Sequence, residues 1–318
     1  MPGATDSKMD RMVQTTLRAD IAIPGTGLHS GKPVRMTLRP APANHGIWFR
    51  RTDVTDRDNM IPACYDAVTA PQLCTPLVNA EGVEVSTVEH VMAALAGCGV
   101  HNALVEIDAP EVPILDGSSA RIVREILRRG LRSQDAPLFV FRVREAIEVR
   151  DGDAMARLEP ADRFEMDYRI EFDEPAIGTQ ELRLDLSNGA FVRELCDSRT
   201  FCRQRDVEAM RAAGLARGGS YENAVVVQDA EVLSPGGLRH ADEFVRHKML
   251  DALGDLALAG APILGRYTGL RAGHAVTNAL LHKLFATPGA VEVMECDAET
   301  AAMLPGVGIE HGDLSRVA

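Results

Sequence analysis

The sequence contains no long hydrophobic run and no concentrated block of basic residues, and these two absences exclude several classes of protein. No window reaches the roughly 18 uncharged apolar residues of a membrane-spanning helix. The opening stretch MPGATDSKMDRMVQTTLRAD also lacks the apolar core of a secretory signal peptide. We therefore expect a cytoplasmic protein that does not span a membrane. The formal net charge of -12 at pH 7 repels polyanions, so nucleic acid is not an expected partner.

Cysteine is sparse and scattered. The six cysteines form no C-x-x-C pair, so the sequence indicates neither a disulfide framework nor a cysteine-rich zinc site, and we expect free thiols. The remaining composition, 46% hydrophobic and 25% charged, is typical of a globular protein. Because 318 residues exceed the usual domain length of about 100–200, we expect two domains or one large domain.

The first half of the chain alternates strand patterns with helical patterns. Apolar residues that recur every second position predict strands, and a period of 3.6 residues predicts helices. The predicted strands span 15–23, 34–39, 46–52 and 102–107, and the predicted helices begin at Ser86 and span 118–129. The polar, turn-rich segment RSQDAP at 132–137 then marks the expected boundary between two domains.

The second half repeats this order. Strands are expected within 138–186, at 224–227 and at 263–270, and helices at 203–214, at 242–260 and from His274. A sheet followed by helices, twice, predicts an α+β fold of two similar two-layer sheet and helix domains, 1–133 and 134–318. The stretch EHVMAALAG in the first half resembles RHKMLDALGDLALAG in the second, as an ancient duplication would explain.

The predicted helix DEFVRHKMLDALGDLALAG carries a polar stripe beside its apolar one. His247, Asp251 and Asp255 are four residues apart and therefore share one face. Two interpretations are open. A histidine and an aspartate one turn apart form an ordinary ion pair on a solvated face, but they also place a nitrogen and an oxygen on one cation, as zinc sites require. The second interpretation needs a third ligand and a base elsewhere in the chain.

The stretch STVEHVMAALAG supplies both. His90 is the candidate third ligand, and Glu89 lies beside it, as in sites where a carboxylate accepts a proton from water at a metal. The alternatives are structural: the Ser86-x-x-Glu89 spacing matches a helix capping box, and His90 alone is more commonly a surface or hydrogen-bonded histidine. Two histidines and one aspartate leave a fourth tetrahedral position open, which favours a hydrolytic over a structural zinc site.

A further histidine begins a predicted helix in GLRAGHAVTNALL. The helix dipole disfavours a positive charge at His274, so a catalytic cation there needs a carboxylate partner, and Asp255 is the candidate. A solvent-exposed histidine near a helix cap is the alternative interpretation.

Six ordered motifs resemble the UDP-3-O-acyl-N-acetylglucosamine deacetylase family, the zinc amidases that commit Gram-negative bacteria to lipid A synthesis. They are STVEHVMAALAG, PEVPILDGSSA, SRTF, GGSYENAVVV, DEFVRHKMLDALGDLALAG and GHAVTN. The resemblance extends from GTGLHSGKPV, near residue 25, to GHAVTNALLHKL, near residue 284. It implies a pair of two-layer β-α-α-β domains, each with a small insert, that hold zinc and substrate in the cleft between them.

Carried over to this chain, the resemblance implies a role for each matching residue. His90, His247 and Asp251 correspond to the zinc ligands, a set that also accepts iron(II). Glu89 corresponds to the general base, and His274 to the cation that stabilises the oxyanion and protonates the leaving amine.

Four further residues match positions around the family's reaction centre. Thr200 resembles the hydroxyl donor to the oxyanion, and Asp255 the carboxylate that orients the catalytic histidine. Lys248 matches a substrate-binding lysine, and Phe201 an aromatic residue that packs on the sugar. His29, in GLHSG, matches a histidine near the site to which we assign no catalytic role.

The resemblance also implies the substrate. We expect a monomer that hydrolyses the N-acetyl amide of UDP-3-O-(3-hydroxyacyl)-N-acetylglucosamine and releases acetate. Segment 202–227 corresponds to an insert that forms a hydrophobic passage for the acyl chain, with Arg203 where the family usually has an aromatic residue. Alternatives are a zinc amidase for another amide and a non-catalytic binding protein with a structural metal, although Glu89 beside an open position argues against the latter.

Overall fold

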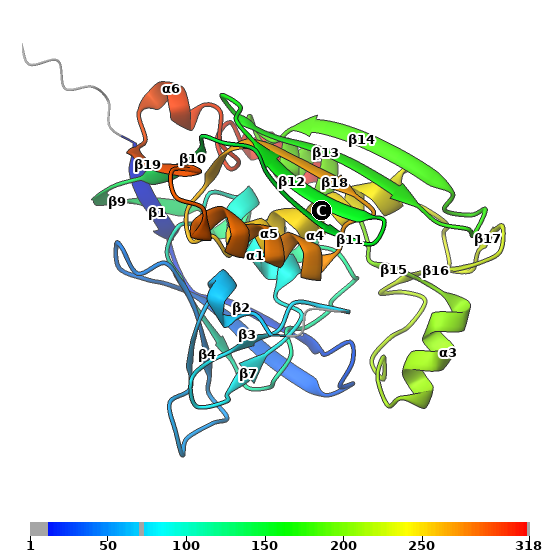
Figure 1. Cartoon of the computed structure of the whole chain (residues 1–318). Helices are drawn as coiled ribbons and strands as arrows, with labels where there is room; N and C mark the ends of the chain where they lie inside the picture. The colour runs from blue at the N-terminus through cyan, green and yellow to red at the C-terminus, as the bar shows by residue number, and fades with distance from the viewer. Residues whose placement is uncertain (1–11, 70–72, 317–318) are drawn as a thin grey trace, which may run out of the picture.

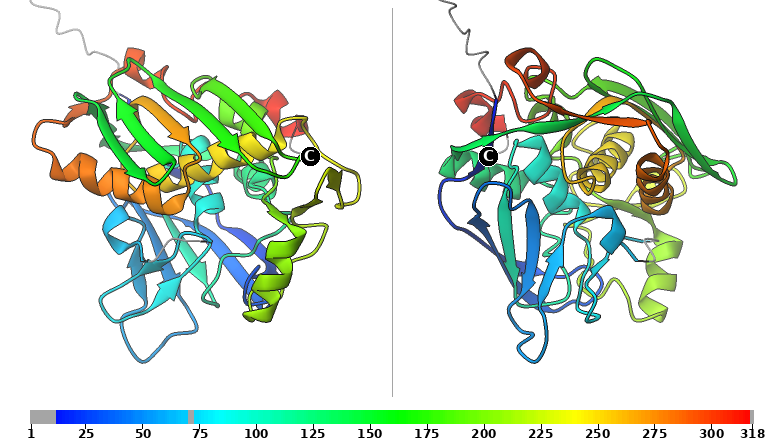
Figure 2. Two further views of the ribbon diagram at one scale, coloured as in Figure 1. Left: turned by 45° about the vertical axis from the view of Figure 1, so that its right-hand side comes forward. Right: turned by 60° about the vertical axis from the view of Figure 1, so that its left-hand side comes forward.

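The structure, a computed structural model, describes residues 12–69 and 73–316. Two β-sheets form its outer layers, and helices α1, α4 and α5 lie between them (Figure 1). The lower sheet in this view comes from the first half of the chain and the upper sheet from the second half. The two further views in Figure 2 show the same layering.

Each half begins with several strands and then alternates helices with further strands. The elements of the first half are β1 (Val13–Leu17), β2 (Ile21–Thr26), β3 (Pro33–Pro40), β4 (Ile47–Arg51), β5 (Met60–Pro62), the 3-10 helix η1 (Tyr65–Ala67), β6 (Leu77–Val78), β7 (Glu84–Val85), α1 (Glu89–Gly97), β8 (Ala103–Ile107) and α2 (Ala120–Arg129). The strands that open the second half are β9 (Leu131–Pro137), β10 (Phe139–Val143), β11 (Ile147–Asp151), β12 (Ala154–Glu159), β13 (Phe164–Glu171) and β14 (Thr179–Asp185). They are followed by the π-helix η2 (Phe191–Leu195), β15 (Phe201–Arg203), α3 (Gln204–Ala212), β16 (Val225–Gln228), β17 (Glu231–Val232), α4 (Glu243–Ala257), β18 (Ile263–Leu270), α5 (His274–Ala286), β19 (Val291–Glu295), α6 (Ala298–Ala301) and the 3-10 helix η3 (His311–Arg316).

The strand order of the two sheets determines where the central helices α1 and α5 begin. The five-stranded sheet has the order β2-β3-β8-β4-β5, and β4 and β8 run parallel because the segment between them, which includes α1, crosses over the sheet. In the seven-stranded sheet β18 is central, with β12 antiparallel on one side and β13 parallel on the other. Since β18 ends at Leu270, the short loop after it positions the start of α5 beside α4.

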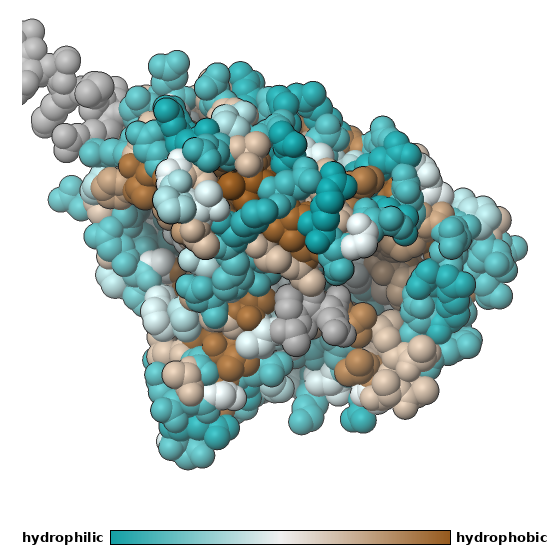
Figure 3. Space-filling model, viewed as in Figure 1, coloured by the Kyte–Doolittle hydropathy of each residue, from teal (hydrophilic) through white to brown (hydrophobic). Residues whose placement is uncertain are grey.

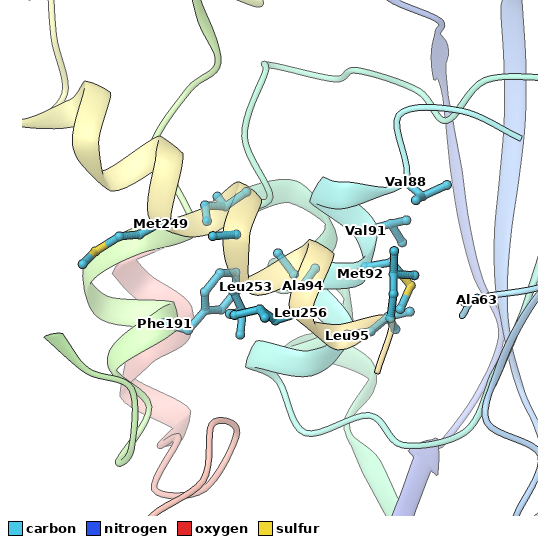
Figure 4. Close-up of a cluster of buried hydrophobic side chains, with 14 of the residues drawn as sticks. Ala63, Val88, Val91, Met92, Ala94, Leu95, Phe191, Met249, Leu253 and Leu256 are labelled. Atoms are coloured by element: carbon cyan, nitrogen blue, oxygen red, sulfur yellow. The ribbon is translucent and has the colours of Figure 1, made fainter. Parts of the chain in front are cut away.

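One hydrophobic core connects the two halves through the contact between α1 and α4. Figure 4 shows Ala94 of α1 facing Leu253 and Leu256 of α4, and all three side chains are buried. The helices approach closely because Gly254 has no side chain: a Cβ added there would lie 2.0 Å from the carbonyl oxygen of Glu89. This contact places the start of α1 against the middle of α4.

The predicted elements can be compared with these bounds. The α+β class is confirmed, and strand 263–270 and the helices at 242–260 and from His274 agree with β18, α4 and α5. The division into domains 1–133 and 134–318 stays a prediction. No helix within residues 12–69 and 73–316 is both long and apolar enough to cross a membrane.

Three local predictions are wrong. Segment 132–137 is not a series of turns, because it belongs to strand β9, most of which pairs with β1 in a two-stranded antiparallel sheet. The strand predicted at 15–23 is two strands, β1 and β2, separated by a bend. The helix expected from Ser86 begins at Glu89, since Ser86 forms backbone hydrogen bonds with residues 110 and 112 instead.

Candidate metal and catalytic site

A cavity of about 640 Å³ contains every residue singled out from the sequence as a metal ligand, base or acid. Its lining comes from the start of α1, the middle of α4, the start of α5 and the segment from β15 to β16. On the face drawn in Figure 3, hydrophobic side chains gather mainly along the waist between the two halves, while the surface above and below is mostly hydrophilic. The cavity is therefore built by both halves of the chain.

Three side chains at this cavity form one potential metal site. His90, His247 and Asp251 each offer a ligand atom, and these atoms all lie within 4.8 Å of one another. The Oδ1 atom of Asp251 lies 3.2 Å from Nε2 of His247 and 3.5 Å from Nε2 of His90. All three residues are buried, so the solvated-face interpretation of the α4 polar stripe is wrong.

Neighbouring groups orient two of these side chains. His247 donates its Nδ1 hydrogen to the carbonyl oxygen of Ser198 at 3.0 Å, which leaves Nε2 with a free lone pair. Lys248 donates to Oδ2 of Asp251 at 3.0 Å, which leaves Oδ1 directed at the histidines. Burial alone would raise the pKa of Asp251, but the adjacent His247 and Lys248 hold this pKa well below its ordinary value. The carboxylate is thus ionised, as a metal ligand must be.

The donor set fits a tetrahedral zinc ion. Bonds of about 2.1 Å at tetrahedral angles place two ligand atoms roughly 3.4 Å apart, close to the 3.2 and 3.5 Å separations of Asp251 Oδ1 from the two imidazole nitrogens. Two nitrogens and one oxygen also match the ligands of catalytic zinc sites, which keep a fourth position open. The residues would also suit iron(II), since imidazole and carboxylate ligands bind both ions.

Glu89 lies beside this trio and does not cap α1. Its Oε2 accepts a hydrogen bond from the backbone N–H of Thr75 at 3.0 Å, so the alternative interpretation of Ser86 and Glu89 as a capping box does not hold. Burial raises the pKa of Glu89, and nearby His274 and His90 oppose this rise only in part. A carboxyl group with a raised pKa in a largely dry cavity is suited to accept and release a proton.

His274 forms an ion pair with Asp255 at the other side of the cavity. Its Nδ1 lies 2.8 Å from Oδ2 of Asp255, and both side chains are buried. Burial by itself lowers the pKa of His274, but the charge and hydrogen bond of Asp255, together with Glu89, raise it to about 9. The carboxylate therefore overcomes the unfavourable helix dipole at the start of α5, and His274 is cationic at neutral pH.

The other residues singled out from the sequence also line the cavity. Thr200 and Lys248 contribute to its wall. The ring of Phe201 packs edge-on against Phe244 at a centroid distance of 4.9 Å and against the imidazole of His247 at 6.2 Å. Aromatic surface thus lies directly beside the candidate metal site.

His29 and Arg203 also line the cavity. The loop at His29 is held by Glu111, whose carboxylate accepts the backbone N–H groups of His29 at 2.7 Å and Ser30 at 2.9 Å. Arg203 donates to both carboxylate oxygens of Asp206, one of them at 3.1 Å. An ion pair therefore stands at the cavity wall where the family that the sequence resembles usually has an aromatic residue.

Sequence reasoning missed two groups that hold the candidate catalytic side chains and their neighbours in place. Thr75 donates its hydroxyl to Oδ1 of Asp255 at 2.7 Å while its backbone binds Glu89, so one buried residue contacts both carboxylates. Glu243 accepts the backbone N–H of Arg199 at 3.0 Å and its Nε at 2.8 Å, which fixes the chain between Ser198 and Thr200. No local sequence pattern indicates a contact between residues this far apart in the chain. The one available signal was that Arg199 lies within the SRTF motif.

Comparisons with known proteins agree over most of the chain. The family model described as UDP-3-O-acyl N-acetylglycosamine deacetylase matches residues 14–286. A UDP-3-O-acyl-N-acetylglucosamine deacetylase of Phenylobacterium zucineum (strain HLK1) is 50% identical over 89% of this chain and 96% of its own length. Proteins of the same name from Anaeromyxobacter sp. (strain Fw109-5) and Myxococcus xanthus (strain DK1622) are 48% and 47% identical, over 92% and 95% of this chain and 95% of each relative.

The geometry predicts which substitutions remove the metal. We expect the purified protein to contain about one zinc or iron ion per chain, and Asp251→Ala to lose it, because two ligands do not hold zinc tightly. Glu89→Gln is the matched control: it also alters a buried carboxylate of the cavity but should keep the metal. Metal analysis by mass spectrometry measures both, and a fully metallated Asp251→Ala would show that the three side chains do not share an ion.

Proposed function

The chain belongs to the UDP-3-O-acyl N-acetylglycosamine deacetylase family, and on this premise we propose that it hydrolyses the N-acetyl amide of UDP-3-O-(3-hydroxyacyl)-N-acetylglucosamine. The products are the free amine and acetate, and the reaction is the committed step of lipid A synthesis. One observation carries the proposal: a buried trio of potential metal ligands shares one cavity with a carboxylate, Glu89, and a cationic histidine, His274.

The metal in this proposal is Zn²⁺, held by His90, His247 and Asp251, with Fe²⁺ as the alternative ion. When bound, it supplies a Lewis acid that polarises the amide carbonyl and lowers the pKa of water. Glu89 then acts as the general base that takes a proton from the attacking water. Its raised pKa brings the carboxylate closer to the working pH, where proton acceptance and release are both efficient.

His274 is the proposed general acid and electrostatic partner. Because its pKa is about 9, it carries a proton at neutral pH and can stabilise negative charge on the amide oxygen before donating that proton to the departing amine. Asp255 binds Nδ1, so the Nε2 hydrogen is the one available for transfer. The hydroxyl of Thr200, in the same cavity wall, is the proposed second donor to the oxyanion.

The rest of the cavity suits the substrate. Lys248 provides a cation for the sugar nucleotide, and Phe201 an aromatic face for the sugar ring. Apolar side chains of the insert between β15 and β16 line the part of the cavity proposed for the acyl chain: Val207, Ala209, Met210, Ala216, Ala224 and Val226. An acyl passage needs such a dry lining. The proposal also includes a monomeric, cytoplasmic protein with domains 1–133 and 134–318 on either side of this cavity.

The activity is tested by acetate release. The metallated protein should release acetate from UDP-3-O-(3-hydroxyacyl)-N-acetylglucosamine, and the same compound without its acyl chain should react with at least roughly tenfold lower kcat/KM, because it forgoes the apolar contacts. Glu89→Gln should keep the metal but lose roughly a thousandfold in kcat. Full metal occupancy without acetate release would contradict the proposal, and equal rates on both compounds would indicate a different amide substrate.

The pH dependence of kcat should reflect the ion pair between His274 and Asp255. Activity requires protonated His274, so kcat should fall as the pH rises through about 9. Asp255→Asn removes the charge that raises this pKa, and the alkaline limb should therefore move to lower pH. Asp242→Asn is the control, since Asp242 pairs with Arg246 near the start of α4 instead. An alkaline limb that does not move in Asp255→Asn would contradict the assignment of His274.

Thr75 offers a test of how the two carboxylates are held. Thr75→Val should keep the shape of the side chain and the backbone bond to Glu89 but leave Oδ1 of Asp255 without its donor. An unpaired buried acceptor costs about 1–3 kcal/mol, so we expect kcat to fall roughly tenfold with little change in KM. Thr75→Ser retains the hydroxyl and should restore most of the rate. A Thr75→Val enzyme with wild-type kcat and pH profile would make Thr75 a packing residue only.

A further inference from the structure

A second cavity, of about 380 Å³, lies at the opposite ends of the helices that carry the candidate metal ligands. It is lined by Met92, Leu95 and Ala96 near the end of α1 and by Leu253, Leu256 and Ala257 near the end of α4. Further apolar side chains close it from other elements: Val100, Leu138, Phe139, Phe164, Pro262, Ile263 and Pro305. None of the proposed chemistry uses this cavity, and its size falls in the range of small-molecule sites.

One hydrogen-bond donor at this cavity has no acceptor among residues 12–69 and 73–316. The hydroxyl of Thr15 donates to the carbonyl oxygen of Gly99, and the backbone N–H of Thr15 donates to Nδ1 of His101 at 3.0 Å. Nδ1 is therefore an acceptor, and in the neutral ring the hydrogen is on Nε2. Burial lowers the pKa of His101 to about 4, so the ring is neutral. Among the described residues, none accepts the Nε2 hydrogen.

A second free donor lies at the same end. Gln14 donates to Oδ1 of Asn44 at 2.8 Å and accepts from the backbone N–H of Asn44 and from Nδ2 of Asn102, both at 2.8 Å. These bonds orient the amide of Asn44, so its Nδ2 group points away from Gln14. No described residue accepts from this Nδ2. Asn44 is an exposed residue that lines the cavity together with His101. The polar end thus presents two uncharged donors.

The chemistry of the lining restricts what can bind. No Asp, Glu, Lys or Arg is among the described residues that line this cavity, so an ionised ligand would be desolvated without a countercharge. The Nε2 hydrogen of His101 suits a carbonyl oxygen as its acceptor. The long apolar wall favours a hydrocarbon chain, whose transfer out of water is favourable. Water alone would satisfy the donors but not the apolar wall.

We propose that this second cavity binds an uncharged acyl compound, an amide or an ester. Its carbonyl oxygen accepts hydrogen bonds from His101 and Asn44, and its apolar chain lies between the ends of α1 and α4. The site is separate from the candidate catalytic cavity, because the two cavities share no lining residue. The inference does not depend on the proposed deacetylase activity.

Methionine methyl groups allow each cavity to be observed separately. Met92 lines the second cavity and Met210 the first, so protein labelled with ¹³C at the methionine methyl groups can be titrated with octanamide and followed by NMR. The Met92 resonance should shift saturably whether or not Met210 also responds. Octanoate and octylamine at neutral pH, which carry the same chain and a charge, should bind at least roughly tenfold more weakly at Met92.

Two variants test the proposed contacts. His101→Phe removes the donor and should weaken octanamide binding at Met92 roughly two- to tenfold, the effect of one net hydrogen bond. Ala257→Phe fills the apolar end and should abolish the Met92 shift while any Met210 response stays. Variants are compared only after their methionine spectra show a native fold. A shift confined to Met210, a Met92 affinity unchanged by both variants, or equal binding of octanoate would each overturn the proposal.

Discussion

The contact between α1 and α4 is the constraint on which the rest of the structure depends. His90 lies in the first turn of α1, and His247 and Asp251 lie in the middle of α4. The three side chains can share a metal ion only because these parts of the two helices are close together. Gly254 makes the contact possible, because any side chain there would overlap the backbone of Glu89. The same approach that brings the ligands together thus also fixes the backbone of the proposed base.

Such close packing concentrates ionisable groups in a buried region. Glu89, Asp251 and Asp255 are acidic, whereas Lys248 and protonated His274 carry positive charge. Buried charges are costly unless they are paired, so a cation held by His90, His247 and Asp251 would add a partner for these carboxylates. This electrostatic argument agrees with the short distances among the three potential ligand atoms.

The sequence predicted the elements that carry chemistry better than it predicted their connections. The period of 3.6 residues identified α4, and spacing placed His247, Asp251 and Asp255 on one face, because these are local properties of a helix. The helix start predicted at Ser86 was wrong for the opposite reason. The local pattern allows a helix and a capping box from Ser86, but residue 86 forms hydrogen bonds with residues 110 and 112, and Glu89 with Thr75, instead. The strand β9 was missed because its sequence is polar and has no apolar alternation. Hydrogen bonds to β1, which lies far away in the sequence, stabilise it as a strand.

The sequences of α1 and α4 are similar, but they differ at one position that makes their contributions to the potential metal site unequal. Aligned on EHVM and RHKM, the two helices place His90 opposite His247, so a duplicated helix would supply two histidines to one ion. Four residues later the copies differ: α4 has Asp251, whereas α1 has Ala94, which is fully buried in the contact with α4. A carboxylate in place of this alanine would be buried within the packed core, away from water and from any countercharge. The tight packing thus admits one aspartate, and a site with three protein ligands keeps a position for water and substrate.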